Sequence, residues 1–131
     1  MARTARGVAA MSGVRVLVCG GRDNLDRAFV FAMLDQVLAK HPLMAICHGG
    51  ATGVDQIAGE WASTHDVPVT EFAADWSLGS KAGPLRNARM LDEFRPTGVV
   101  AFPGGRGTAD MTRQAEAAGL PVWRPVAEQR P

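Results

Sequence analysis

Short apolar runs alternate with segments of helical spacing along nearly the whole chain, and this alternation limits the possible folds more than any other feature. Five runs are rich in β-branched and other apolar residues, at 14–20, 43–50, 67–72, 97–105 and 120–125. Between them, apolar residues recur every three or four positions at 25–37, 54–64, 86–94 and 108–118. The pattern predicts five buried strands separated by four helices.

The predicted fold class follows from this order of elements. Strands that alternate with helices pair in parallel, and right-handed crossovers place the helices over the sheet. The runs are apolar on both faces, as expected for strands covered on both sides. The sequence therefore predicts an α/β fold, a Rossmann-like doubly wound sandwich of about five parallel strands with helices on both faces. Asp23 or Asn24 is expected to cap the first helix, and Gly119 to follow the last.

One compact domain accounts for the length of 131 residues. We expect it to span 14–125, with a disordered leader at 1–13 and a short tail at 126–131. No apolar run approaches the roughly 20 residues that span a bilayer, and the leader has too short an apolar part for a secretory signal. A cytoplasmic protein without a membrane partner is therefore expected.

Charge and cysteine content narrow the classes of partner. Fourteen Lys and Arg against thirteen Asp and Glu argue against a broad basic surface for a nucleic acid polymer, so any anion site must be local. Cys19 and Cys47 end apolar runs and are expected to be buried thiols, with a disulfide or a metal-binding pair as the alternative. His48 and His65 have no Cys or carboxylate partners at metal-ligand spacing, so neither a metal site nor a required cofactor is predicted.

Glycine pairs follow three of the predicted strands, as Gly20-Gly21, Gly49-Gly50 and Gly104-Gly105. The carboxyl ends of parallel strands meet at one edge of a sheet, so the pairs are expected to gather there. Glycine lets a backbone approach a ligand closely, and the helix that follows offers unpaired N–H groups. Such turns also serve structural needs, but three pairs at one edge predict an anion site. The spacing matches neither a Walker A loop nor G-x-G-x-x-G.

Polar and aromatic side chains near the same edge complete the predicted site. Arg86 is placed to hold a phosphate or carboxylate in a bidentate manner. Asp55 either compensates a helix dipole or accepts hydrogen bonds from ribose hydroxyls. His48 either bonds to the backbone or lines the pocket, and Trp76 either packs against the sheet edge or stacks on a base.

The predicted ligand-binding residues are Gly20, Gly21, Arg22, His48, Gly49, Gly50, Gly53, Asp55, Trp76, Lys81, Arg86, Asn87, Pro103, Gly104, Gly105, Gly107 and Thr108. The predicted partner is a small nucleotide-derived molecule.

Three linked motifs, HGGATGVDQIAGEWA (48–62), ADWSLGSKAGPLRNARM (74–90) and FPGGRGTADM (102–111), occur in this order after successive predicted strands. With these motifs the chain resembles the SLOG superfamily, and within it the small stand-alone YspA-like, YpsA-related domains, over roughly 14–125. The resemblance implies a Rossmann-like fold and a pocket beneath the glycine loops for a nucleotide-derived ligand, such as ADP-ribose or an NAD derivative. A homodimer or higher homo-oligomer is also expected.

The chain is also similar to the Lonely Guy phosphoribohydrolases in RNARM and PGGRGT, and those enzymes release a base from a nucleoside 5′-monophosphate. This resemblance implies a catalytic or phosphate-binding role for Arg86. Their catalytic glutamate corresponds to Met111 here, and a thioether is neither an acid nor a base. Asp110 lies about 100° away around a helix and is expected to point elsewhere unless the helix starts differently.

The sequence leaves three functions open. The first is a domain that binds a nucleotide or nucleotide-derived ligand. The second is a phosphoribohydrolase or N-glycosidase that uses Arg86 with Asp110 or Asp55. The third is an interaction subunit with a vestigial pocket.

Overall fold

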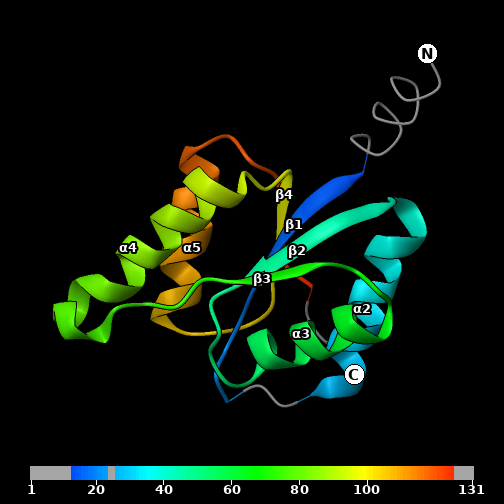
Figure 1. Ribbon diagram of the computed structural model, residues 1–131, viewed down its shortest axis with the longest axis horizontal. Helices are drawn as coiled ribbons and strands as arrows, with labels where there is room; N and C mark the ends of the chain where they lie inside the picture. Colours follow the sequence, from blue (N-terminus) through cyan, green and yellow to red (C-terminus); the bar gives the residue numbers. More distant parts are fainter. Residues whose placement is uncertain (1–12, 24–25, 126–131) are drawn as a thin grey trace, which may run out of the picture.

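The computed structural model describes residues 13–23 and 26–125, and these form one parallel sheet in the order β3-β2-β1-β4-β5 (Figure 1). The strands are β1 (Val14–Cys19), β2 (Leu43–His48), β3 (Val69–Glu71), β4 (Gly98–Ala101) and β5 (Val122–Trp123). The winding direction reverses between β1 and β4, where a doubly wound sheet opens a crevice. The predicted α/β fold class is confirmed.

Helices cover both faces of the sheet (Figure 1). On one face lie α2 (Arg27–Lys40) and α3 (Val54–Thr64). On the other lie α4 (Ala82–Arg89), the π-helical turn η2 (Met90–Phe94) and α5 (Arg106–Ala117), with the 3₁₀ helix η1 (Trp76–Lys81) leading into α4. No helix within the described ranges is long and apolar enough to cross a membrane.

Alternation along β1 divides the core into two layers. Val16 and Val18 pack with residues of α2 and α3, whereas Leu17 and Cys19 pack with residues of η2 and α5. Cys19 and Cys47 are both free and buried, which confirms the prediction of buried thiols. Burial raises the pKa of the Cys19 thiol to about 12, so this group packs as a small neutral side chain.

The prediction of five buried strands holds for the three central strands and is wrong for the two edges. All three residues of β3 are exposed, and β5 has only two residues. The predicted run at 97–105 ends as a strand at Ala101, and the chain then turns before α5. An edge strand has a neighbour on one side only, so a short ladder suffices to hold it.

Helix boundaries differ from the predicted ones mainly at their starts. The side chain of Asp26 caps α2 by accepting a hydrogen bond from the Phe29 N–H, so Asp23 does not hold this position. Asn24 lies outside the described residues, as do 1–12 of the predicted leader and the tail. α4 begins at Ala82, before the predicted start at Arg86. Gly119 follows α5 with a φ of 81°, as predicted for a left-handed residue after a helix.

Candidate functional site

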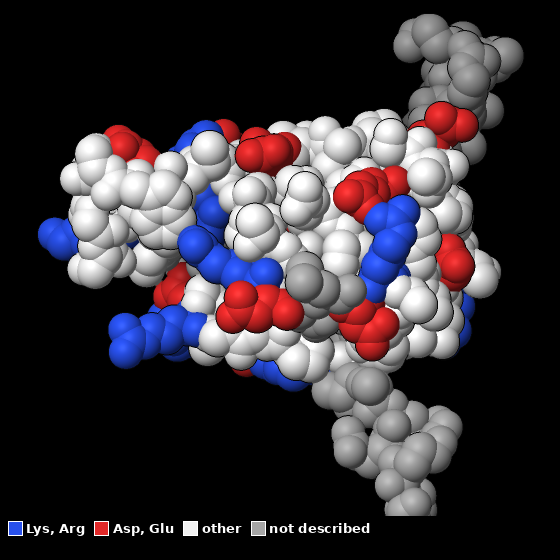
Figure 2. Space-filling view, turned by 90° about the horizontal axis from the view of Figure 1, so that it is seen from below, with Lys and Arg blue, Asp and Glu red and all other residues white. Residues whose placement is uncertain are grey.

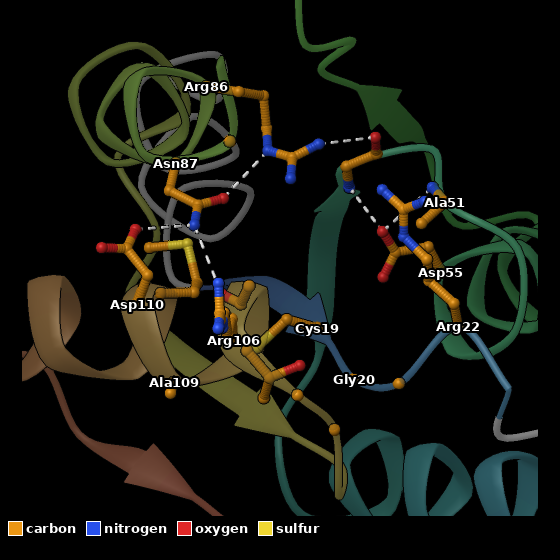
Figure 3. Close-up of a pocket in the computed structure, with 18 of the residues that line it drawn as sticks. Cys19, Gly20, Arg22, Ala51, Asp55, Arg86, Asn87, Arg106, Ala109 and Asp110 are labelled. Carbon is orange, nitrogen blue, oxygen red and sulfur yellow. Dashed lines mark hydrogen bonds between the residues drawn. The ribbon is translucent and has the colours of Figure 1, made fainter. Parts of the chain in front are cut away.

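A cavity of about 930 Å³ lies at the carboxyl ends of the strands, where the loops after β1, β2 and β4 meet η1, α4 and the start of α5 (Figure 3). The predicted site residues that line it are Gly20, Gly21, Arg22, Gly49, Asp55, Trp76, Arg86, Asn87, Pro103, Gly104, Gly105, Gly107, Thr108 and Asp110. His48, Gly50, Gly53 and Lys81 are predicted residues that do not line it.

Gly53 joins two loops and does not face the cavity. Its φ of 77° and ψ of −129° suit glycine, and an added Cβ would lie 2.5 Å from the carbonyl oxygen of Arg22. The next residue, Val54, donates its N–H to the carbonyl of Gly21 at 3.2 Å. The loop after β2 therefore packs directly on the backbone of the loop after β1.

Gly104 serves the same purpose on the other side of that loop. An added Cβ at Gly104 would lie 2.7 Å from the amide nitrogen of Gly21, and the Gly21 N–H donates to the carbonyl of Pro103 at 2.9 Å. The interpretation that the glycine pairs serve the packing of the turns is thus correct for some of these glycines, including Gly104. These close approaches hold the three loops around one opening.

The start of α5 presents backbone N–H groups at the cavity. Gly105 is its N-cap and supplies no side-chain hydrogen bond, and Arg106, Gly107 and Thr108 form the first turn. All four residues line the cavity. An added Cβ at Gly105 or Gly107 would meet no atom within 4 Å. Because the first N–H groups of a helix have no partner within it, this end of α5 is suited to an anion.

Arg86 reaches the cavity from α4, and hydrogen bonds fix its side chain, among them a long one of 3.5 Å from Nη1 to the carbonyl of Phe72. Its Nη1 donates to the carbonyl of Gly49 at 2.8 Å, and its Nε donates to Oδ1 of Asn87 at 2.9 Å (Figure 3). Burial lowers the pKa of Arg86, but an arginine keeps its charge at any physiological pH. The guanidinium is therefore a fixed positive charge in the wall.

Asn87 connects Arg86 to the start of α5. Its side chain is 2% exposed, and its Nδ2 donates to Oδ2 of Asp110 at 2.9 Å and to the carbonyl of Gly107 at 3.4 Å. One amide thus orients the guanidinium with its oxygen and holds α5 with its nitrogen. The sequence predicted Asn87 as a ligand residue, and the structure also makes it a link between two walls.

Replacing Asn87 with alanine is expected to lower the free energy of unfolding by about 2 kcal/mol, because it removes the partners of several buried polar groups. Chemical denaturation of Asn87→Ala and of Asn87→Asp distinguishes loss of the acceptor for Arg86 from loss of the donor to Asp110. The aspartate keeps the acceptor for Arg86 but places a carboxylate against Asp110, so it should be at least as destabilising. Stability equal to wild type in both variants would contradict this role.

Asp110 also lines the cavity, but its carboxylate is already bound by the protein. It accepts hydrogen bonds from Asn87 and from Gln114 at 2.7 Å, and it forms an ion pair with Arg113. Met111 is 1% exposed and packs in the core, and it also lines the cavity. Asp110 was expected to point elsewhere unless the helix started differently; its bond from Asn87 of α4 holds it at the wall that α4 and α5 share.

Asp55 has one bound oxygen and one without a partner. Oδ2 accepts hydrogen bonds from the N–H groups of Gly49 and Ala51, at 3.1 and 3.2 Å. Oδ1 is buried, and no described residue bonds to it. Burial raises the pKa of this carboxyl, against the bonds from Ala51 and Gly49.

Of the two alternatives predicted for His48, the structure shows the hydrogen bond to the backbone. Its Nδ1 accepts a hydrogen bond from the Gly50 N–H at 2.9 Å, so the proton of the neutral ring is on Nε2. Burial lowers the pKa of His48, which favours this neutral form. His48 thus shapes the loop after β2 from behind the cavity wall.

The mouth of the cavity carries aromatic and cationic groups. Trp76 lines the cavity and is 57% exposed, and the Arg22 guanidinium carbon lies 5.4 Å from its ring centroid. Arg106 and Arg113 also line the cavity, and neither was among the residues predicted from the sequence. The position of Arg106 between the predicted glycines of GGRGT is the sequence feature that could have identified it. Figure 2 shows positive and negative side chains interspersed on one face, with no broad basic patch there.

Comparison with known proteins supports the resemblance to the SLOG superfamily, independently of the structure. The model of the YspA, cpYpsA-related SLOG family matches residues 14–79, which run from β1 to η1 and include Asp55. The Gene 61 protein of Mycobacterium phage D29 is 39% identical over 117 residues, which cover 82% of this chain and 93% of the phage protein. A serine–tRNA ligase of Paramagnetospirillum magneticum is 32% identical over 127 residues, and the match spans only 29% of that protein.

Proposed function

The chain belongs to the YspA, cpYpsA-related SLOG family, and we propose that it binds a nucleotide or nucleotide-derived ligand in the cavity at the β1–β4 switch point. Membership of this family suggests nucleotide-related binding in general. The observation that carries the proposal is the uncapped start of α5, which opens into a cavity of about 930 Å³. This volume is within the usual range for small-molecule sites.

Phosphate groups are proposed to bind at Gly105, Arg106, Gly107 and Thr108. The backbone N–H groups of this turn and the positive end of the helix dipole favour an anion. Arg106 lies in the same turn, and Arg22 and Arg86 line the same cavity. Three guanidinium groups that line one cavity favour a ligand with more than one negative charge, such as ADP-ribose, NAD or a nucleoside diphosphate.

The base is proposed to lie at the mouth, against the indole of Trp76. An exposed aromatic ring beside a cavity offers a flat apolar face for stacking. Arg22 already contacts this ring, and its guanidinium is well suited to stack on a base as well.

Binding without base release is the function that the wall residues support best. Met111 occupies the position of the glutamate that the hydrolase resemblance requires, and its side chain packs in the core. The nearby carboxylate of Asp110 is held by Asn87, Arg113 and Gln114. A carboxylate with these bonds is suited to joining α4 and α5.

Arg86→Ala should weaken nucleotide binding by at least about tenfold, because it removes a charge-assisted contact. Thermal shift with AMP, ADP, ADP-ribose and NAD measures this, since a ligand at 100 times its Kd stabilises by about 2.7 kcal/mol. Arg89→Ala is the matched control, because Arg89 lies on the same helix, pairs with Glu93 and does not line the cavity. No shift of the wild type with any nucleotide, or equal binding by Arg86→Ala, would overturn the proposal.

A further inference from the structure

Asp55 is only 6% exposed, and its two carboxyl oxygens differ in whether they have a hydrogen-bond partner. Backbone N–H groups of Gly49 and Ala51 bind Oδ2, while Oδ1 is buried and has no hydrogen-bond partner among the described residues. Native proteins rarely leave a buried carboxyl oxygen unpaired, because the loss of water is then uncompensated. Asp55 lines the cavity, so a ligand is able to supply the missing partner.

Gly49 places Asp55 next to Arg86. The N–H of Gly49 donates to Asp55, and its carbonyl accepts from Nη1 of Arg86 at 2.8 Å. Nε of Arg86 is bonded to Asn87, whereas Nη2 has no acceptor within the described part of the chain. Figure 3 shows the guanidinium and the carboxyl facing the same space. An open acceptor and an open donor therefore border one region of the cavity.

The chemistry of this pair selects among ligand groups. A phosphate or a carbonyl oxygen only accepts hydrogen bonds, so it leaves Oδ1 without a donor. An ammonium or an exocyclic amine only donates, so it leaves Nη2 without an acceptor, and Arg86 repels a cation. A carboxamide or a base edge donates and accepts through two separate atoms, whereas a hydroxyl group does both through one oxygen, so a single hydroxyl between the two residues satisfies both.

We propose that Asp55 and Arg86 bind a ribose hydroxyl of the ligand, so that the site selects nucleotides that carry this hydroxyl over those that lack it. This inference rests on the proposed function, and it assigns the sugar to the wall between β2 and α4. The phosphates then lie at the start of α5, and the base at the mouth. Asp55 becomes a residue that determines specificity.

Calorimetric titration with ADP and its 2′-deoxy, 3′-deoxy and 2′,3′-dideoxy forms tests the inference. The wild type should bind ADP at least about tenfold more tightly than the dideoxy form, because the latter leaves buried polar groups unpaired. Asp55→Asn keeps an oxygen for the N–H groups of Gly49 and Ala51 but turns an amide nitrogen toward the hydroxyl. In this variant the preference should fall to less than about threefold.

Asp23→Asn is the matched control, because Asp23 is an exposed carboxylate that lines the same cavity. It removes the same charge and should keep the full preference for ADP. Equal binding of ADP and dideoxy-ADP by the wild type would overturn this inference and leave nucleotide binding intact. Binding of none of the four ADP forms would overturn this inference, while the thermal shift with AMP, ADP-ribose and NAD still decides the proposed function. If Asp55→Asn does not fold, the wild-type preference alone decides.

Discussion

Replacing Gly53 with alanine is expected to lower the free energy of unfolding by about 3 kcal/mol or more. At a φ of 77° and a ψ of −129°, only glycine avoids backbone strain. The added Cβ would also lie 2.5 Å from the Arg22 carbonyl oxygen. The backbones at Gly53 and Arg22 are both held by further hydrogen bonds, so neither can shift to relieve this contact. Urea denaturation followed by circular dichroism measures the effect.

Gly107→Ala is the control for this prediction. Gly107 is helical, and an added Cβ meets no atom within 4 Å. Alanine in a helix is preferred over glycine, so this variant should be stabilised, by less than about 1 kcal/mol. Equal stability of the Gly53 variant and the wild type would show that the loops after β1 and β2 do not pack as closely as described.

Replacing Gly107 with valine should weaken nucleotide binding by about 100-fold, which corresponds to about 2.7 kcal/mol. The branched side chain stands at the open start of α5, where it separates a phosphate from the N–H groups that are proposed to bind it. The fold should remain intact, because the position is helical and unobstructed. Calorimetric titration with ADP-ribose and ADP measures the loss.

Ala117→Val provides the matched substitution at the far end of the same helix. Ala117 is exposed and does not line the cavity, so this variant should bind as the wild type does. Wild-type affinity in Gly107→Val would move the phosphates away from α5. Loss of binding in both variants would point to a general disturbance of the helix.

Periodicity and glycine positions predicted where the loops meet, because both depend on local sequence. They did not separate the roles of individual glycines. Gly53 was predicted as a ligand residue, yet it packs against the backbone near Arg22, and Gly107 of the same predicted set faces open space. That difference depends on which loop lies across from each glycine, and the sequence does not contain it in any local pattern.

Side-chain partners were equally beyond the sequence. Asp55 was predicted as an acceptor for ribose hydroxyls, but its unpaired oxygen becomes visible only once Gly49 and Ala51 are seen to occupy the other. Asp110 was expected to point elsewhere, and its bond to Asn87 across two helices turns it to the cavity wall. A homo-oligomer and a cytoplasmic location stay predictions.

Native mass spectrometry of the full chain mixed with AMP, ADP, ADP-ribose and NAD tests the central claim most directly. We expect one bound nucleotide per chain for at least one of these compounds, and loss of that adduct in Gly107→Val. A wild-type protein that forms no adduct with any of the four would contradict nucleotide binding in the cavity. An adduct of equal strength in Gly107→Val would contradict the site at the start of α5.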